Sequence, residues 1–402
     1  MKSSTRACAR GESVTTSKTY PILQVENLTM HYTTRKGAVK AVEDVSFSLD
    51  KGEALGLVGE SGCGKTSVAL TLLRLLPENA QFLGGHVYFF RDGSDEAHAR
   101  RAVGKPVKIL LDEQEHQGRL VEVDRSQLVL DARLNGRTQQ IKLGRDDITR
   151  IGVDLTALSD EEMRPIRWKG ISMIFQAAMN SLNPVYKVGD QIIEAMQTHM
   201  PISIPEARER VAQLFQLVGL DRQLMDRYPH EYSGGMKQRA VIAMALACDP
   251  DIIIADEPTT ALDVIVQDKI LREMRQIQKK LNMSMIYISH DIAVIAEVAD
   301  KVGVMYAGGL VEFGPSEAIF KSPVHPYTKA LMSAFPSIKG EKVKLAALPG
   351  EPPDLIKPPS GCRFHPRCPY ATEICERQVP QFIEHKPKQY AACWNPLTSL
   401  SS

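Results

Sequence analysis

The sequence of 402 residues has no long apolar run, no secretory signal and no excess of charge of one sign. No apolar stretch reaches the roughly 18 residues that a membrane-spanning helix needs. Basic residues near the N-terminus are not followed by an apolar stretch, so we expect no secretory signal and a disordered tail over residues 1–20. The formal net charge is +1, so the composition favours neither nucleic acid nor a membrane surface as a direct ligand.

Cysteine is scarce outside the C-terminal end of the chain. Three of the seven cysteines, Cys8, Cys63 and Cys248, precede residue 361, and the other four follow it. Because no export signal is found, we expect the protein to remain in the cytosol, where thiols stay reduced. A cysteine cluster in that compartment indicates a metal site or catalysis more often than disulfides.

Short apolar β-type runs alternate with helical patterns along most of the chain. This order predicts an α/β fold with a parallel, doubly wound sheet and helices on both faces. Alternation in residues 22–32 and 39–49 predicts an antiparallel hairpin region near the N-terminus. The stretch ALGLVGESGCGKTSVALTLLRLL predicts a strand, a glycine-rich turn and a helix, and further core strands and helices are predicted in SGGMKQRAVIAMALAC, DIIIADEP, QDKILREMRQIQKKL and MSMIYISHD.

Two segments depart from this alternation. Residues 91–150 carry twelve basic and eleven acidic side chains, and alternating runs around Asn135-Gly136 predict a small antiparallel β insertion with a turn there. The balanced charge gives no support for a nucleic-acid patch. A proline-rich stretch begins after residue 322. The predicted division is a tail (1–20), a main domain (21–321) that contains the insertion, and a C-terminal extension (322–402).

Residues 59–66, GESGCGKT, fit the pattern G-x-x-x-x-G-K-[ST] between an apolar strand and a helix. Glycines let backbone N–H groups converge on phosphate oxygens, and the following helix presents its positive N-terminal end to them. Lys65 is expected to reach the β- and γ-phosphates of ATP, and Thr66 to ligate Mg²⁺. The candidate ATP-binding residues of this P-loop are Gly59, Glu60, Ser61, Gly62, Cys63, Gly64, Lys65, Thr66 and Ser67.

Cys63 lies inside this loop, and two interpretations of it remain open. A helix N-terminus lowers the pKa of a thiol, in which case alkylation of Cys63 blocks ATP binding. The alternative is that Cys63 is a small residue that fills space in the loop.

In IIIADEP, Asp256 and Glu257 stand at the C-terminal end of an apolar run that predicts a buried strand. Ligands of open α/β sheets bind at the C-terminal ends of the strands. Asp256 suits support of Mg²⁺, and Glu257 suits activation of a water for attack on the γ-phosphate. Taken alone, such a pair is usually a helix cap or a solvated turn. Together with the P-loop, it favours catalysis.

A second anion-binding helix start, YSGGMKQR, lies about twenty residues before the carboxylate pair. One ATP needs only one P-loop, so Ser233, Gly234 and Gly235 need another role. In this stretch the chain resembles the ATP-binding-cassette (ABC) ATPases, whose signature is LSGGQ. Tyr232 and Met236 depart from the usual Leu and Gln, whereas the Ser-Gly-Gly is intact.

The resemblance assigns further positions within residues 22–315. Tyr32 matches the aromatic residue that stacks on adenine. Gln176 matches the Q-loop glutamine, which contacts Mg²⁺ and the water and couples to a membrane partner. Asp263 matches the D-loop, and His290 matches the switch histidine that contacts the γ-phosphate. The implied catalytic residues are Glu257, His290 and Gln176, and the implied Mg²⁺ ligands are Thr66, Gln176 and Asp256.

The resemblance also implies an architecture and a mode of assembly. A P-loop NTPase cassette of this kind joins a parallel core sheet to an antiparallel β subdomain and a helical subdomain. Two cassettes pack head to tail, so that the P-loop of one and the Ser-Gly-Gly of the other enclose each ATP. This single cassette is therefore expected to need a second cassette and separate membrane subunits.

The segment from Ser322, SPVHPYTKALMSAFP, and the tail after it resemble the C-terminal extension of oligopeptide and dipeptide importer ATPases. In that subfamily four cysteines are associated with an iron–sulfur cluster, which implies Cys362, Cys368, Cys375 and Cys393 as ligands here. Four thiolates suit [4Fe–4S] or zinc. Zinc knuckles usually contain C-x₂₋₄-C pairs, and this spacing does not, so [4Fe–4S] is favoured and zinc is kept as the alternative.

The function implied by the resemblance is the ATP-hydrolysing subunit of a peptide importer at the cytoplasmic face of the cell membrane. The implied partners are a second ABC ATPase, two transmembrane permeases and an extracytoplasmic substrate-binding protein, with no nucleic acid. Nickel, sugar or glutathione as cargo stays open, because the ATPase never contacts the cargo. A soluble cassette ATPase of DNA repair or translation is the alternative from another class, but such proteins usually carry two cassettes or nucleic-acid-binding insertions.

Overall fold

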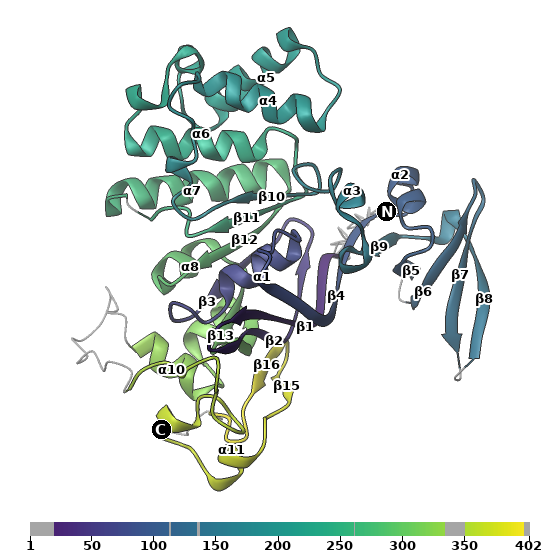
Figure 1. Cartoon of the computed structure of the whole chain (residues 1–402), viewed down its shortest axis with the longest axis vertical. Coiled ribbons are helices and arrows are strands. Elements are labelled where there is room, and N and C mark those ends of the chain that lie inside the picture. The colour runs from purple at the N-terminus through teal and green to yellow at the C-terminus, as the bar shows by residue number, and fades with distance from the viewer. Residues whose placement is uncertain (1–19, 112–113, 135–136, 261, 334–349, 398–402) are drawn as a thin grey trace, which may run out of the picture.

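The computed structural model describes residues 20–111, 114–134, 137–260, 262–333 and 350–397 (Figure 1). The predicted N-terminal tail, apart from residue 20, and the predicted turn at Asn135-Gly136 lie outside the described residues. Among the described residues, no helix combines the length and the apolar character that a membrane crossing requires.

A mainly parallel sheet forms the core of the described chain, as the alternating pattern predicts. Its parallel strands are, in spatial order, β10 (Ile171–Ile174), β11 (Ile252–Asp256), β12 (Ser284–Ser289), β3 (Ala54–Val58) and β13 (Lys301–Tyr306). Antiparallel strands continue this sheet: β14 (Gly309–Pro315), β16 (Gln389–Ala392) and β15 (Phe382–Lys386). The C-terminal extension thus adds strands to the same sheet that carries the P-loop.

A second sheet is antiparallel throughout its described strands. Its spatial order is β2 (Gly37–Asp50), β1 (Pro21–Thr34), β4 (Ala80–Asp92), β9 (Arg150–Asp154), β5 (Pro106–Leu111), β6 (Gln114–Val123), β7 (Gln127–Leu134) and β8 (Arg137–Gly144). The β1–β2 pair confirms the predicted hairpin region. Strands β5 to β8 confirm antiparallel strands in the insertion, but they extend the N-terminal sheet and do not form a sheet of their own.

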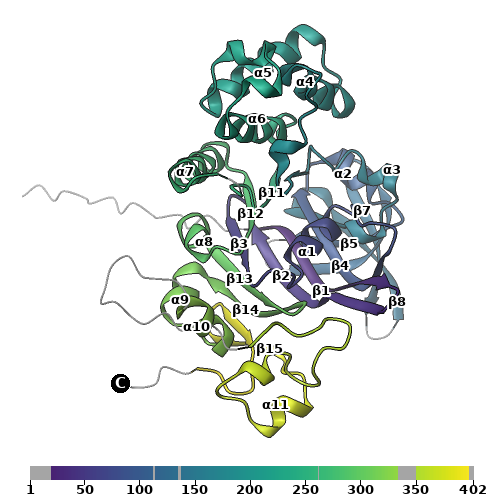
Figure 2. The same cartoon turned by 60° about the vertical axis from the view of Figure 1, so that its left-hand side comes forward.

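The helices divide between a helical lobe, the flanks of the core sheet and the C-terminal extension. Figures 1 and 2 show α4, α5 and α6 together beyond one end of the core sheet. The α-helices are α1 (Lys65–Leu72), α2 (Glu96–Arg101), α3 (Asp160–Met163), α4 (Val188–His199), α5 (Ile204–Leu217), α6 (Gly234–Leu246), α7 (Val264–Leu281), α8 (Ile292–Val298), α9 (Ser316–Lys321), α10 (Pro326–Ser333) and α11 (Glu373–Arg377). The 3₁₀ helices are η1 (Arg145–Asp147), η2 (Leu155–Ala157), η3 (Ala178–Asn180), η4 (Arg222–Asp226), η5 (Pro229–Glu231) and η6 (His365–Arg367).

The core sheet is buried on both faces, which explains its continuous apolar strands. In β11, Ile253 and Ala255 belong to a cluster that includes residues of α6, α7 and α8. Ile252 and Ile254 belong to a second cluster that includes β1, β2 and α1. Because neighbouring side chains of a strand point to opposite faces, the run of isoleucines supplies both clusters at once.

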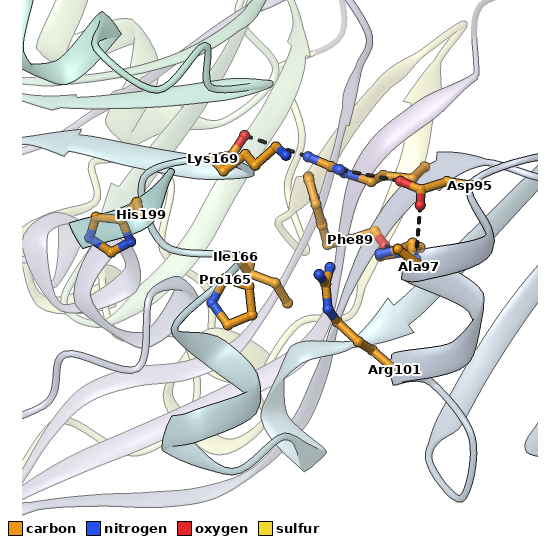
Figure 3. Close-up of a pocket in the computed structure, with 10 residues that line it drawn as sticks. Phe89, Asp95, Ala97, Arg101, Pro165, Ile166, Lys169 and His199 are labelled. Carbon is orange, nitrogen blue, oxygen red and sulfur yellow. Dashed lines mark hydrogen bonds and ion pairs between the residues drawn. The ribbon is translucent and has the colours of Figure 1, made fainter. Parts of the chain in front are cut away.

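Helix α2 of the insertion was not predicted, because six residues are too few to show a helical period. Asp95 caps it by accepting a hydrogen bond from the N–H of His98 at 2.9 Å. Arg91 links this helix to the core, since it contacts Asp95 at 3.2 Å and Asp251 at 2.5 Å. A cavity of about 210 Å³ lies beside α2, and Figure 3 shows the side chain of Arg101 pointing toward Pro165 and Ile166.

His98 anchors α2 to the second sheet. The side chain is 2% exposed, and its Nε2 lies 3.2 Å from the carbonyl oxygen of Phe89 and 3.1 Å from that of Ile151. Burial lowers the pKa of His98 to about 4. The ring is therefore neutral at pH 7, and its N–H donates to both carbonyls.

This histidine predicts an acid-sensitive contribution to stability. Between pH 6.5 and about 4 the unfolded chain binds a proton at His98 that the folded chain does not. The free energy of unfolding should therefore fall as the pH falls through this window, by up to about 3 kcal/mol. Urea unfolding at a series of pH values should show a smaller fall in the His98→Gln variant. His230→Gln, at an exposed site, serves as the control, and equal slopes for parent and His98→Gln would contradict the prediction.

Candidate nucleotide-binding site

The P-loop connects β3, which ends at Val58, to α1, which begins at Lys65. Gly59 and Gly64 have φ angles of 153° and 105°. A Cβ atom on Gly59 would lie 2.2 Å from the carbonyl oxygen of Met305, and one on Gly64 would lie 2.1 Å from that of Ala41. Only glycine fits at either position, because both the backbone angle and the space exclude a side chain.

Lys65 lies buried within the loop that it follows. Its Nζ donates to the carbonyl oxygens of Gly59 at 2.8 Å and Glu60 at 3.0 Å. These contacts hold the ammonium group at the mouth of the loop. Burial raises the pKa of the Cys63 thiol, although nearby Lys65 opposes the shift. Of the two interpretations left open, the geometry favours Cys63 as a neutral residue that fills the loop.

Asp256 lies at the end of β11, beside the start of α1. Its side chain is 1% exposed and accepts a hydrogen bond from Thr66, while its Oδ1 has no hydrogen-bond partner among the described residues. Burial raises the pKa of Asp256 and outweighs the hydrogen bond from Thr66 and the nearby charge of Lys65. A buried carboxylate oxygen without a partner, next to a hydroxyl, is a donor set that fits a hard divalent cation.

Glu257 brings together the three residues for which sequence analysis predicted catalysis. One of its carboxylate oxygens accepts from Gln176 Nε2 at 3.0 Å, and the other accepts from His290 Nδ1 at 2.8 Å. Thr260 donates to the first oxygen at 3.1 Å. Partial burial would raise the pKa of Glu257, but the hydrogen bonds and charges of its neighbours, His290 first, hold the pKa below its usual value. The carboxylate is therefore ionised and is oriented from both sides.

Tyr32 lies on β1, next to the first turn of α1. Its hydroxyl is 3.1 Å from the Oγ of Ser67, and its ring is partly buried. This contact places the predicted adenine-stacking residue beside the P-loop helix.

The predicted signature residues lie on a different part of the molecule. Ser233 is the N-cap of α6 and accepts a hydrogen bond from the N–H of Met236 at 3.3 Å. Ser233 and Gly234 are exposed, and both views place α6 with the helical lobe, apart from α1 (Figures 1 and 2). A Cβ on Gly235 would lie 3.0 Å from Cγ1 of Val266, so α6 and α7 approach closely there.

Tyr232 takes the place of the usual signature leucine as a core residue. Its ring is buried, and its hydroxyl donates to the carbonyl oxygen of Leu224 at 2.5 Å. Tyrosine at this position therefore still buries an apolar side chain, as leucine would, and its hydroxyl adds one hydrogen bond. Asp263, the predicted D-loop residue, caps α7 by accepting from the N–H of Val266 at 3.0 Å.

The predicted metal site of the C-terminal extension is contradicted. No group of three or more His, Cys, Asp or Glu side chains within the described ranges is arranged to hold a metal ion, so the prediction of a [4Fe–4S] cluster is wrong. The same finding gives no support to the zinc alternative. Burial raises the pKa of the thiols of Cys362, Cys368 and Cys393, the last to about 12. The four free cysteines are Cys362, Cys368, Cys375 and Cys393.

The side chain of Cys375 contacts a hydroxyl group and an amide group. Its Sγ lies 3.5 Å from Thr372 Oγ1 and 3.6 Å from Asn395 Nδ2. The backbone N–H of Cys362 donates to the carbonyl oxygen of Cys375 at 2.8 Å. The thiol of Cys393 interacts electrostatically with those of Cys362, Cys368 and Cys375, so the four cysteines lie near one another without the arrangement that a metal ion needs.

The parallel sheet, the glycine-lined loop around Lys65 and the carboxylates at the end of β11 define a P-loop cassette ATPase. Residues 42–164 and 127–260 match the family described as ABC transporter, in two overlapping segments. Residues 311–375 match the family described as oligopeptide/dipeptide transporter, C-terminal region.

Curated relatives match over nearly the whole chain. The dipeptide transport ATP-binding protein DppD of Bacillus subtilis is 40% identical over 376 residues, which cover 93% of this chain and 94% of the relative. The oligopeptide transport ATP-binding protein OppD of Escherichia coli is 37% identical over 381 residues, which cover 94% of each. The chain therefore belongs to the ABC ATPases of the oligopeptide and dipeptide transporter family, and it is an ATP-binding, ATP-hydrolysing protein.

Solved structures confirm the predicted cassette fold. A dimeric bacterial ABC transporter cassette is similar with a TM-score of 0.52 at 21% identity, covering 73% of this chain and 98% of that one. The cbiO1 protein of Clostridium perfringens has a TM-score of 0.50 at 21% identity, covering 75% and 91%.

Proposed function

We propose that this protein energises the import of dipeptides or oligopeptides across the cell membrane, from the cytoplasmic face. The observation that carries the proposal is the contact of Glu257 with both Gln176 and His290, beside a buried Asp256 and the P-loop. The names of the relatives and the match of residues 311–375 support peptides as the cargo. The partners that fit are a second ABC ATPase, two permeases and an extracytoplasmic substrate-binding protein.

ATP binding is assigned to residues 59–67 together with Tyr32. Phosphate binding is assigned to the N–H groups of the loop and to the N-terminal end of α1, because the first N–H groups of a helix have no carbonyl partner within that helix. Lys65 moves its hydrogen bonds from the loop carbonyls to phosphate oxygens. Tyr32, fixed near Ser67, offers its ring to the adenine.

Residues for a divalent cation lie next to this phosphate site. Thr66, Asp256 and Gln176 are the residues that would hold Mg²⁺. When bound, the ion neutralises charge on the β- and γ-phosphate oxygens.

Glu257 is the group proposed to activate the attacking water. Its ionised carboxylate takes a proton from the water as the water oxygen bonds to the γ-phosphorus. The bond between that phosphorus and the β–γ bridging oxygen breaks, and ADP and phosphate are formed. Gln176 contacts one carboxylate oxygen of Glu257 and His290 contacts the other, so the two side chains orient the carboxylate for this step.

Ser233, Gly234, Gly235 and Asp263 are proposed to complete the ATP site of a second cassette. Exposed N–H groups at the start of α6 suit the phosphates of a nucleotide brought by that partner. We assign residues 21–321 to the ATPase domain, with the insertion at 91–150, and residues 322–402 to the extension. The insertion has no assigned role in the chemistry, since its strands lie at the far end of the second sheet (Figure 1).

Transport by the assembled complex tests this proposal. Proteoliposomes that contain the ATPases, the permeases and the binding protein should take up labelled dipeptides or oligopeptides only when ATP reaches the ATPase face. Ser233→Arg places a bulky cation where the partner's nucleotide should bind, so uptake should fall to background while ATP binding by the isolated subunit persists. Uptake of nickel, sugar or glutathione in place of peptides would overturn the cargo assignment, and ATP-independent uptake would overturn the function.

A further inference from the structure

Arg367 joins the C-terminal extension to the P-loop. Its Nη1 and Nη2 contact the two carboxylate oxygens of Glu60 at 2.7 Å and 3.0 Å, in a bidentate arrangement. Nη1 also donates to the hydroxyl of Tyr306 at 3.3 Å, and the guanidinium lies 5.7 Å from the centre of that ring. Arg367 is only 8% exposed, and 307 residues separate it from Glu60 in the sequence.

A second contact from the C-terminal side holds the backbone of the same residue. The N–H of Glu60 donates to the hydroxyl of Tyr327 on α10 at 3.1 Å. Tyr327 is fully buried, and its ring centre lies 4.6 Å from that of Tyr306 and 5.3 Å from that of Phe364. Tyr327 thus fixes the N–H of Glu60 and Arg367 fixes its carboxylate, and both residues lie in the C-terminal extension.

Glu60 connects this anchor to the phosphate-binding lysine. Its carbonyl oxygen accepts from Lys65 Nζ at 3.0 Å, so a shift of its backbone would displace the ammonium group. Glu60 is also the single acidic residue of GESGCGKT. Without a partner its charge would repel the phosphates of ATP, and repulsion between like charges is strong where water is partly excluded.

We propose that Arg367 is a positioning residue for ATP: it neutralises Glu60 and holds the P-loop, so the extension forms part of the nucleotide site. This inference rests on the proposed function, because it concerns the same ATP site. It predicts a defect in nucleotide affinity, since Arg367 touches neither the attacking water nor its base.

The central test is Arg367→Ala in the full-length protein, with ATP affinity measured by equilibrium titration. We expect the Kd for ATP to rise about tenfold, as for loss of one charge-assisted interaction. In the assembled complex the KM for ATP should rise similarly, while kcat at saturating ATP should change less than about twofold. Arg377→Ala is the matched control, because Arg377 belongs to the same extension and pairs with Glu373 on exposed α11. Its ATP affinity should equal that of the parent.

A double variant separates the charge effect from general damage to the fold. Glu60→Gln combined with Arg367→Ala removes both charges and should recover most of the lost affinity. Arg367→Lys, which keeps the charge but not the bidentate geometry, should fall between parent and Arg367→Ala. Unchanged affinity in Arg367→Ala, or no recovery in the double variant, would overturn the inference. If the parent and Arg377→Ala both fail to bind ATP, the proposed function fails instead.

Discussion

Glu257→Gln lowers the rate of ATP hydrolysis by roughly 10²- to 10⁴-fold and leaves ATP binding intact. The amide keeps the shape of the side chain and can still contact Gln176 and His290, but it cannot accept a proton from the attacking water. The ATP-binding residues that we propose are the P-loop and Lys65, which the substitution does not touch. The resemblance to ABC ATPases implies a dimer that ATP closes and hydrolysis opens, so we expect the variant to stay associated with its partner cassette in the presence of ATP.

Steady-state phosphate release by the assembled complex and ATP titration of the isolated subunit measure the two effects separately. Glu317→Gln, at an exposed site on α9, is the control for loss of one carboxylate and should hydrolyse ATP at the parental rate. A Glu257→Gln protein with the parental rate would exclude Glu257 as the base.

Lys65→Ala weakens ATP binding by roughly 10²-fold or more and removes measurable hydrolysis at ordinary ATP concentrations. The ammonium group is buried at the mouth of the loop, where it contacts the carbonyl oxygens of Gly59 and Glu60. Its loss removes the positive charge that faces the phosphates, so a bound polyphosphate loses a charge-assisted partner.

A fluorescent ATP analogue and displacement by ATP provide the measurement for this variant. Lys279→Ala, in the exposed last turn of α7, is the control for loss of one lysine. If Lys65→Ala binds ATP with parental affinity, the nucleotide is bound elsewhere and the assignment of residues 59–67 is wrong. Circular dichroism of both variants checks that the fold is retained.

The features predicted correctly from local sequence are those whose cause is local. Gly59 and Gly64 have positive φ angles, which is a requirement of the local backbone, whereas the carbonyl oxygens that a Cβ would strike belong to the distant residues Met305 and Ala41. Ser233 begins α6 and caps it through an N–H group three residues ahead, which is again a short-range pattern. The buried strands IIIAD and ALGLV are continuous apolar runs because both faces of the core sheet are covered.

The features that sequence reasoning missed or misjudged depend on where distant segments meet. The resemblance and the clustering of four cysteines predicted a metal site in the extension, but no group of side chains among the described residues is arranged to hold a metal ion. The insertion was expected as a small unit, yet β5 pairs with β9 and prolongs the N-terminal sheet. No sequence pattern predicts a role for Arg367, because that role depends on its contact with Glu60, which is distant in the sequence.

Short-range sequence was therefore sufficient for the glycine-rich loop, the apolar core strands and the start of α6, and the resemblance to ABC ATPases supplied the cassette fold and the positions proposed to contact ATP. Only the tertiary structure brings Gln176 and His290 to the carboxylate of Glu257. It also determines the raised pKa values of the buried thiols and the contact between the extension and the P-loop. Their cause is desolvation and the pairing of charges between segments as much as 307 residues apart, which no local pattern encodes.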